Sequence, residues 1–384
     1  MGVMNTPDFP RGAAEVARFR AALLDFFDDR GRDLPWRRTS DPYLILVSEI
    51  MLQQTRVETV VPYYRKWIER FPDAATLAAA DTEEVLRYWQ GLGYYRRARN
   101  LQLAAREVEA EWGGALPGDA KALGTLPGVG PYTAGAVASI AFGEAVPAVD
   151  GNVRRVMARL LDDPAPGAAL LAREVGALVP PERPGDFNQA LMELGATVCT
   201  PRSPRCDRCP VAEWCAARAA GTQESRPRPP ARKTVPRMVE AVAVVVRPGD
   251  SGWEVLLRRR PDDGLLGGMW ECPGVEVGSG GAPHPAGEGG FREAARALAG
   301  RLCPGAGGMP TLDEVLPAVD HVFTHLRVTY RPVRFRRPAG TDILSPGQEL
   351  PPPLRWVAFG VLGELPIPRA QQRILGGAEP EAVA

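Results

Sequence analysis

Four cysteines constrain this chain more than any other feature of its sequence. Cys199, Cys206, Cys209 and Cys215 fall within seventeen residues, in the pattern C-x6-C-x2-C-x5-C. In a cytosolic chain, cysteines that lie so near one another in the sequence are expected to bind metal rather than to form disulfides. Zinc would be satisfied by four thiolates, but structural zinc sites usually pair two separated C-x2-C knuckles. One compact loop with a single C-x2-C favours a cluster with four corner irons, a [4Fe-4S] cluster.

The pattern of apolar residues changes near residue 220 and divides the 384-residue chain into two parts. In the first part, apolar residues recur at helical spacing, and no strand-like alternation is present. Helices are predicted over residues 14–29, 43–55, 82–89, 98–112, 133–142, 153–161 and 187–198. In the second part, strands are predicted over residues 239–247, 253–259 and 328–335, and a helix over 291–302. The first part is therefore predicted to be mainly α and the second α+β.

The segment between the two parts, TQESRPRPPARKTVPR at residues 222–237, is polar, basic and rich in proline. Such a composition is typical of an extended linker. We therefore predict a helical domain over residues 12–221, a linker over 222–237, an α+β domain over 238–375 and a disordered tail over 376–384.

Charge and hydropathy limit the kinds of partner. The formal net charge is zero, which argues against a uniformly basic protein that coats DNA but allows a local basic face. No apolar run is long enough to span a bilayer, and the N-terminus lacks a basic segment followed by an apolar core. We therefore expect a cytoplasmic protein with no membrane partner.

A second motif, LPGVGPYTA, lies at residues 126–134. Gly128 and Gly130 allow a tight turn between two helices, and the backbone N–H groups at the start of the helix from Thr133 can hold a phosphate. The motif resembles the helix-hairpin-helix of DNA repair proteins, although a plain glycine connection between helices is the alternative. Asp150 follows about twenty residues later. DNA glycosylases that contain such a helix-hairpin-helix place a catalytic aspartate at this offset from it.

A third motif, SEIMLQQTR at residues 48–56, carries Glu49 among the apolar residues of a predicted helix. The alternative is a glutamate on the exposed, polar face of that helix. If Trp36, Tyr43 and Met51 form an apolar pocket around Glu49, the pKa of its carboxyl group is raised, which suits proton donation.

Together with Pro35–Arg37 and GLGYY at residues 91–95, this stretch resembles the catalytic helix of the MutY family of adenine DNA glycosylases, in the helix-hairpin-helix and endonuclease III superfamily. The resemblance runs from about Phe19 to about residue 375. It implies a helix-hairpin-helix glycosylase domain whose cysteine loop binds a [4Fe-4S] cluster. The implied partner is double-stranded DNA in which adenine lies opposite 8-oxoguanine or G, and the implied process is base excision repair by a monomer.

The resemblance also implies roles for single residues. Glu49 is expected to protonate adenine, and Asp150 to stabilise the positive charge on the sugar. Tyr132 and Asn152 are expected to hold the carboxylates and the sugar by hydrogen bonds. The residues expected to bind DNA or the base in this domain are Arg37, Gln54, Tyr94, Gly128 and Gly130. Among these, Arg37 is expected to contact the flipped purine, and Gln54 and Tyr94 to enter the base stack.

Tyr132 stands where bifunctional relatives carry a lysine that forms a Schiff base with the sugar. The chain is therefore expected to cut the glycosidic bond and to leave the DNA strand intact.

The second domain resembles a Nudix fold, specifically the MutT-like C-terminal domain of the same family, through its hairpin, GGMWECPG at residues 267–274 and the following helix. Nudix hydrolysis needs several carboxylates on that helix to hold divalent metal. Only Glu293 remains, because the two other metal-binding positions are Arg296 and Ala297. We therefore expect a catalytically inactive domain that serves recognition.

Phe323, Thr324 and His325 resemble the Phe-Ser-His loop with which the family meets 8-oxoguanine, with threonine in place of serine. An aromatic ring can wedge beside the lesion, and a hydroxyl and an imidazole can bond to its altered edge. The alternative is that Phe323 is a core residue and His325 a satisfied surface residue.

Three other functions remain open. One is an endonuclease III-type glycosylase for oxidised pyrimidines, against which Tyr132 and the second domain argue. Another is a sanitising Nudix hydrolase. The third is a non-catalytic DNA-binding module with a structural metal, which requires that Glu49 and Asp150 do not converge.

Overall fold

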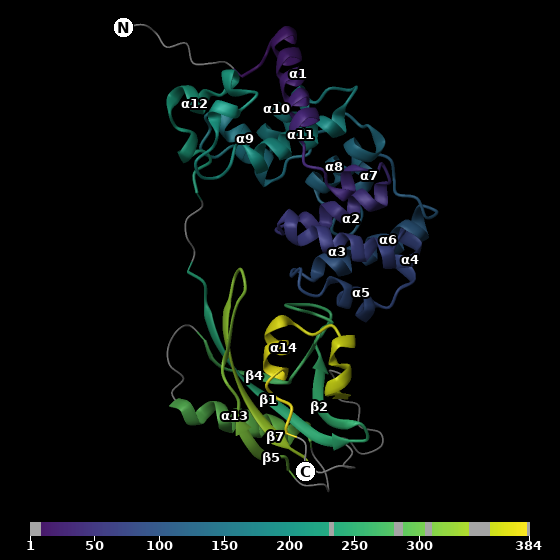
Figure 1. Ribbon diagram of the computed structural model, residues 1–384, viewed down its shortest axis with the longest axis vertical. Helices are drawn as coiled ribbons and strands as arrows, with labels where there is room; N and C mark the ends of the chain where they lie inside the picture. Colours follow the sequence, from purple (N-terminus) through teal and green to yellow (C-terminus); the bar gives the residue numbers. More distant parts are fainter. Residues whose placement is uncertain (1–8, 230–233, 280–286, 304–308, 338–353, 382–384) are drawn as a thin grey trace. The chain divides into compact units, whose positions relative to one another are not determined.

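The computed structural model describes residues 9–229, 234–279, 287–303, 309–337 and 354–381 (Figure 1). The chain forms two compact units. The first consists of Met1–Ala80 and Asn100–Ala231, and the second of Asp81–Arg99 and Arg232–Ala384. Residues 230–233 of the predicted linker and 382–384 of the predicted tail lie outside the described residues.

The segment Asp81–Arg99 is part of the second compact unit. Several hydrogen bonds join it to the rest of that unit, and two of them are the following. The indole N–H of Trp270 donates to Glu83 (3.1 Å), and the Ile367 N–H donates to the side chain of Gln90 (3.3 Å). These bonds link residues far apart in sequence, which a local pattern does not reveal.

Helices make up the first unit. They are α1 (Ala13–Arg30), η1 (Pro35–Arg37), α2 (Pro42–Leu52), α3 (Val57–Arg70), α4 (Ala74–Ala79), α6 (Arg96–Glu111, which starts in the second unit), α7 (Ala120–Leu123), α8 (Pro131–Phe142), α9 (Gly151–Leu160), α10 (Ala168–Leu178), α11 (Pro184–Thr197), η2 (Cys206–Arg208), η3 (Ala212–Trp214), α12 (Ala216–Ala220) and η4 (Gln223–Ser225). No helix in the described part of the chain combines the length and the apolar character needed to cross a membrane.

All the predicted helices are present, with ends that differ by at most four residues. The apolar pattern did not predict α3, α4 and α10, nor the short helices α7, α12 and α14 (Arg369–Leu375). In α3, Val60, Tyr64 and Trp67 are buried at helical spacing, and Pro62 interrupts that pattern. Helix α5 (Thr82–Trp89), in the second unit, has the predicted bounds.

Helix α2 is buried on nearly all sides. It begins at Pro42, whose missing N–H suits the first turn, and the carboxylate of Asp41 caps it by accepting from the N–H groups of Tyr43 (2.8 Å) and Leu44 (3.1 Å). Residues 45–51 are all buried. A glutamate on this helix therefore has no exposed polar face to occupy, which excludes the surface alternative for Glu49.

The cysteine loop packs against a hydrophobic core of the first unit. This core joins α1, α9, α10 and α11, and includes Phe19, Phe187 and Trp214. The rings of Phe19 and Trp214 meet edge to face at 5.4 Å. Because Trp214 belongs to the loop itself, the loop and the helices share one core.

A mixed sheet dominates the second unit. Its strands among the described residues are β1 (Arg237–Gly249), β2 (Gly252–Arg259), β3 (Trp270–Glu271), β4 (Gly274–Ser279), β5 (Thr311–Val315), β6 (Val319–Val322), β7 (Arg327–Arg336) and β8 (Leu354–Ala358), accompanied by α13 (Gly287–Leu302), η5 (Phe359–Glu364) and α14 (Arg369–Leu375). The strand order is β3-β2-β1-β7-β5, with β4 paired to β1, β6 to β7 and β8 to β2. Only β1 and β7 are parallel among these described pairs.

Side chains alternate across β1 and cover both faces of the sheet. Val242 and Val244 pack in one core with α14, and Ala241 and Ala243 pack in another with α13. The sheet thus lies between these two helices (Figure 1). This two-faced burial explains the apolar run that predicted β1.

The tail beyond residue 375 is ordered as far as it is described, contrary to the prediction of disorder. Ala378 is fully buried in the core that α14 shares with the sheet. Its carbonyl accepts a hydrogen bond from Arg334 (3.3 Å). The small side chain gave no hydrophobic signal in the sequence, yet it fills a space that only the packed sheet creates.

Candidate functional site

A cavity of about 1010 Å³ opens within the first unit. Six predicted site residues line it: Arg37, Glu49, Gln54, Tyr132, Asp150 and Asn152. Trp36 and Ile45 contribute apolar wall. Tyr43 and Met51, which were predicted to surround Glu49, are buried but do not line the cavity, and the Tyr43 hydroxyl instead donates to the Phe71 carbonyl (3.0 Å). A pocket of this size, with convergent polar groups on apolar walls, suits a small organic group.

Glu49 is only 5% exposed, although it lines the cavity. Its carboxylate accepts a hydrogen bond from the hydroxyl of Tyr132. Burial raises the pKa of Glu49 to about 7; the Tyr132 hydrogen bond and the charge of Arg37 oppose this rise, and the charge of Asp150 adds to it. A large share of Glu49 is therefore protonated at neutral pH, the state that a proton donor needs.

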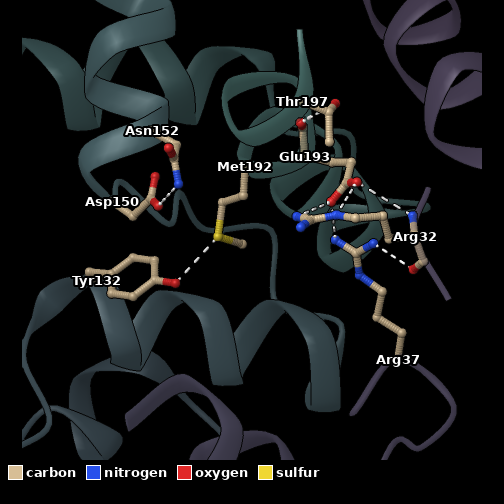
Figure 2. Close-up of polar contacts among 8 residues, drawn as sticks. All are labelled: Arg32, Arg37, Tyr132, Asp150, Asn152, Met192, Glu193 and Thr197. Atoms are coloured by element: carbon tan, nitrogen blue, oxygen red, sulfur yellow. Dashed lines mark hydrogen bonds and ion pairs between the residues drawn. The ribbon is translucent and has the colours of Figure 1, made fainter. Parts of the chain in front are cut away.

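Asp150 occupies a different environment at the N-cap of α9. Its carboxylate accepts from the side-chain amide of Asn152 at 2.8 Å (Figure 2). It also accepts from the Val153 N–H at 2.6 Å. Burial raises the pKa of Asp150 above its usual value, and the hydrogen bonds from Val153 and Asn152 limit that rise. Glu49 and Asp150 thus present carboxyl groups of different kinds to the cavity, one in an apolar helix and one held by donors that favour its charged form.

The segment that leads to Asp150 is fixed by close packing. The Ala148 N–H donates to the side chain of Asn188 (3.1 Å), whose amide nitrogen donates back to the backbone of the same segment (2.9 Å). Gly135 of α8 lies against this segment, because a Cβ there would stand 2.3 Å from the Pro147 carbonyl oxygen. A side chain at position 135 would displace the backbone that carries Asp150.

Glu193 of α11 also lines the cavity, and the sequence analysis did not identify it. Its fully buried carboxylate accepts from Arg32 (2.7 Å) and Arg37 (2.9 Å) (Figure 2). Burial alone would raise the pKa of Glu193, but these two arginines lower it below the usual value. The adjacent Met192 places its sulfur 3.3 Å from the Tyr132 hydroxyl. A glutamate among the apolar positions of α11 was the only signal in the sequence.

The predicted hairpin lies in the loop between α7 and α8. Gly128 has φ of 78°, and a Cβ there would stand 2.7 Å from the Cβ of Asn100, so the turn requires glycine. Gly130 is the N-cap of α8, and the position of its absent Cβ has no neighbour within 4 Å. Open space at a helix N-terminus is what a bound phosphate needs. The helix begins at Pro131, two residues before the predicted start, because proline suits the first turn.

The two residues predicted to enter the base stack share an unusual backbone. Gln54 has φ of 56° and Tyr94 has φ of 49°, in the left-handed region that side chains other than glycine adopt at a cost. Gln54 follows the end of α2 and is exposed, and Tyr94 is 43% exposed. Within the second unit, the Tyr94 hydroxyl lies 2.6 Å from the Thr324 hydroxyl. Each strained turn therefore presents its side chain outward.

The remaining predicted recognition residues lie between β6 and β7. Thr324 and His325 are exposed, whereas Phe323 is half-buried and packs on the sheet core. The ring of Phe323 meets His321 edge to face at 4.5 Å. The His325 imidazole is thus exposed to a ligand, the Thr324 hydroxyl is exposed but contacts the Tyr94 hydroxyl, and Phe323 partly serves the core. On α13, Glu293 is exposed.

The four cysteines line one small pocket together with Arg159 and Gln223. None of the four is in a disulfide. Among the described residues, no three histidine, cysteine, aspartate or glutamate side chains converge closely enough to hold a single metal ion. The four cysteines nevertheless share one pocket, where all four can serve as ligands of a single cluster.

Three parts of the chain match known families. Residues 47–181 match the HhH-GPD superfamily of base excision DNA repair proteins, and residues 241–376 match the NUDIX domain. Residues 199–215 match the iron-sulfur binding domain of endonuclease III. The cysteine loop is therefore an iron–sulfur cluster site, as its spacing predicted.

Replacing Cys209 by Ser should remove most of the bound iron and lower the midpoint of thermal unfolding, because the loop shares its core with α1 and α11. Elemental analysis and calorimetry of anaerobically purified protein measure both effects. Cys303→Ala, which removes a buried thiol from the second unit, is the matched control and should retain the iron. Wild-type protein that contains zinc and no iron would contradict this assignment.

Individual relatives agree with the family matches. The chain is 39% identical to an adenine DNA glycosylase of Homo sapiens, over 90% of this chain and 71% of that protein. It is 50% identical to an adenine DNA glycosylase of Mycolicibacterium smegmatis, over 52% of this chain and 69% of that protein. A solved structure of a thermostable thymine-DNA glycosylase superposes with a TM-score of 0.51 at 33% identity, over 54% of this chain and all of that one.

Proposed function

The chain belongs to the family of adenine DNA glycosylases, base excision repair enzymes that hydrolyse N-glycosidic bonds, and from this membership we propose that it excises adenine mispaired with 8-oxoguanine or G. The observation that carries the proposal is the pair Glu49 and Asp150, two carboxyl groups with different environments that line one cavity. Their convergence argues against a DNA-binding module without catalysis. We also propose that the protein acts as a monomer on double-stranded DNA in the cytoplasm.

Base removal requires that the adenine leave the stack, because its reacting atoms are inaccessible inside a duplex. Gln54 and Tyr94 are suited to fill the vacated space, since strained turns hold both side chains outward. The flipped base then occupies the cavity beside Trp36. We propose that Arg37, which pairs with Glu193 at 2.9 Å and lines the same cavity, contacts the purine.

The chemistry then follows from the two carboxyl groups. Protonated Glu49 donates its proton to N7 of adenine, the C1′–N9 bond breaks, and its electron pair leaves with the base as neutral adenine. The sugar becomes oxocarbenium-like, and ionised Asp150 stabilises its positive charge. Water adds to C1′ and returns a proton to Glu49. Tyr132 and Asn152 hold the two carboxylates through the hydrogen bonds described above.

We propose that the reaction stops at an abasic site. A strand-cleaving glycosylase uses an amine to form a Schiff base with the sugar. Tyr132 lines the cavity instead, and no lysine is among the described residues that line it. The buried phenol has a pKa raised well above its usual value, so it remains a hydrogen-bond donor and not a nucleophile.

One panel of duplexes tests this function. The wild-type enzyme should release free adenine from A opposite 8-oxoguanine and from A opposite G, and nothing from thymine glycol opposite A. The strand should break only after alkali. Release of thymine glycol would instead favour a pyrimidine glycosylase. Strand scission without alkali, together with borohydride trapping of the protein on DNA, would contradict the proposed single activity.

We further propose that Phe323, Thr324 and His325 recognise 8-oxoguanine. Support comes from the exposure of Thr324 and His325 and from the contact of Thr324 with Tyr94. Replacing both Phe323 and His325 by Ala should therefore reduce the preference for A opposite 8-oxoguanine over A opposite G. Single-turnover rates on the two substrates measure that ratio.

Val322→Ala is the matched control for this double variant, because Val322 is an exposed residue of the same hairpin. It should keep the wild-type ratio. If the double variant loses the same fraction of its single-turnover rate on both substrates, the hairpin stabilises the fold and does not recognise 8-oxoguanine. Hydrolysis of 8-oxo-dGTP by the full-length protein would mean that the Nudix-like unit is catalytic, contrary to the loss of its metal-binding carboxylates.

A further inference from the structure

Arg159 of α9 is buried between the cluster loop and the segment that follows it, with an exposed fraction of only 2%. One edge of its guanidinium faces the loop. Nη1 donates to the Cys199 sulfur (3.2 Å) and to the Thr200 carbonyl (2.8 Å), and Nη2 donates to the Pro201 carbonyl (3.3 Å). The Arg159 carbonyl oxygen lies 3.5 Å from the sulfur of Cys215. One residue therefore contacts two of the four cluster cysteines.

The Nε atom of Arg159 binds residues 222–228, which we call the strap. It donates to the carbonyls of Gln223 (2.7 Å) and Arg226 (3.1 Å). The sequence analysis placed this segment in an extended linker, but the strap contains η4 and is fastened to the end of α9. Thr222 and Arg226 both bond to Asp162, at 2.5 Å and 2.7 Å. Gln223 lines the same pocket as the four cysteines.

The charge of Arg159 lacks a carboxylate partner among the described residues, because its hydrogen-bond acceptors are neutral carbonyls and the sulfur of Cys199. A buried cation needs a compensating negative charge. The thiolate ligands of an iron–sulfur cluster bring negative charge into this pocket. Arg205 and Arg218 also line it, but both are exposed and keep their hydration.

We propose that Arg159 is the positioning residue that couples the cluster to the strap. The anionic cluster supplies its counter-charge, and its guanidinium in turn fixes the strap and raises the cluster's reduction potential, since a cation bonded to a ligand sulfur favours the reduced form. When the cluster is lost, Arg159 is left buried without a counter-charge. The arginine must then reach water, and the strap loses the two bonds to its carbonyls.

The test uses the full-length protein with its cluster loaded. Arg159→Met removes both the positive charge and the hydrogen-bond donors of the guanidinium. Arg159→Lys keeps the positive charge but loses the planar set of N–H donors. The matched control is Arg202→Met, an exposed arginine of the cluster loop. Three quantities are measured without DNA: the cluster's reduction potential, its rate of loss to a chelator, and amide hydrogen exchange across residues 222–228. Exchange is also followed in wild-type protein after chelation.

Arg159→Met should lose its cluster roughly 10- to 100-fold faster than wild type, as expected when a residue that supports a metal ligand is removed. It should also show a lower potential and about tenfold faster exchange in the strap. Arg159→Lys should keep a potential near that of wild type while its strap exchanges faster. Wild-type protein freed of its cluster should exchange like Arg159→Met.

An unchanged cluster reduction potential in Arg159→Met would contradict the proposed electrostatic effect of Arg159 on the cluster. If amide hydrogen exchange in the strap of the wild-type protein stays the same after the cluster is chelated, the proposed coupling between the cluster and the strap is wrong. The second measurement needs no variant, so it decides the matter even if Arg159→Met does not fold.

Discussion

Glu49→Gln is expected to bind the mismatched duplex with wild-type affinity and to release adenine roughly 100- to 10,000-fold more slowly, the range that a positioned general acid contributes. Glutamine keeps the size of the side chain and can accept the hydrogen bond from Tyr132. It has no acidic proton for N7. Single-turnover base release and a separate binding isotherm distinguish the two effects.

The wild-type rate should depend on pH in a direction that the burial of Glu49 fixes. Protonated Glu49 is the active form and its pKa is raised to about 7, so the rate should fall as the pH rises through that value. Asp150 must be ionised, so the rate should also fall at acid pH. Glu49→Gln should lack the alkaline limb.

The control for Glu49→Gln is Glu69→Gln, which changes an exposed glutamate at the end of α3. It should leave both the rate and the pH profile unchanged. Near-wild-type single-turnover rates in Glu49→Gln would show that Glu49 is not the general acid of the reaction.

Asp150→Asn is the second variant with a large expected effect, a loss of roughly 100- to 1000-fold in the single-turnover rate, as for removal of one preorganised electrostatic group. The developing positive charge on the sugar loses its partner. Asparagine caps helices as well as aspartate does, so α9 should keep its N-cap bond to Val153. The thermal midpoint should therefore change little while catalysis is lost.

A matched substitution separates these two roles of Asp150. Asp119→Asn changes the exposed N-cap of α7, where Asp119 accepts from the Ala122 N–H (2.9 Å). It should alter neither the rate nor the stability appreciably. If Asp150→Asn lost its activity only in proportion to a fall in stability, the carboxylate would be a cap and not part of the reaction.

Much of the site could be predicted because its residues lie in short, self-contained motifs. Four cysteines in seventeen residues are sufficient to predict a metal centre. Gly128 and Gly130 mark a turn, because backbone sterics at single residues control φ. Glu49 within an apolar helix predicts a carboxyl group with a raised pKa, and its burial in α2 bears this out.

Other parts of the site could not be predicted, because they depend on residues far apart in the sequence. Glu193 meets Arg32 and Arg37 across more than 150 positions, and no local pattern identifies the two arginines as its partners. The expected neighbours Tyr43 and Met51 lie on α2 as predicted, but the helix turns them away from the cavity. Ala378 is buried because the packed core between α14 and the sheet has a space that its methyl group fills.

The sequence by itself determined the elements and the chemistry of each motif: where most helices and strands run, which carboxyl groups are candidates, and which loop binds the cluster. These properties depend on local sterics, periodicity and the donor atoms of single residues. The tertiary structure alone decided which groups meet. It brought Glu49, Asp150 and Tyr132 to one cavity, and it buried Arg159 between the cysteines and the strap. Burial and mutual distance set the pKa values and the charge balance, and both arise only when distant segments pack together.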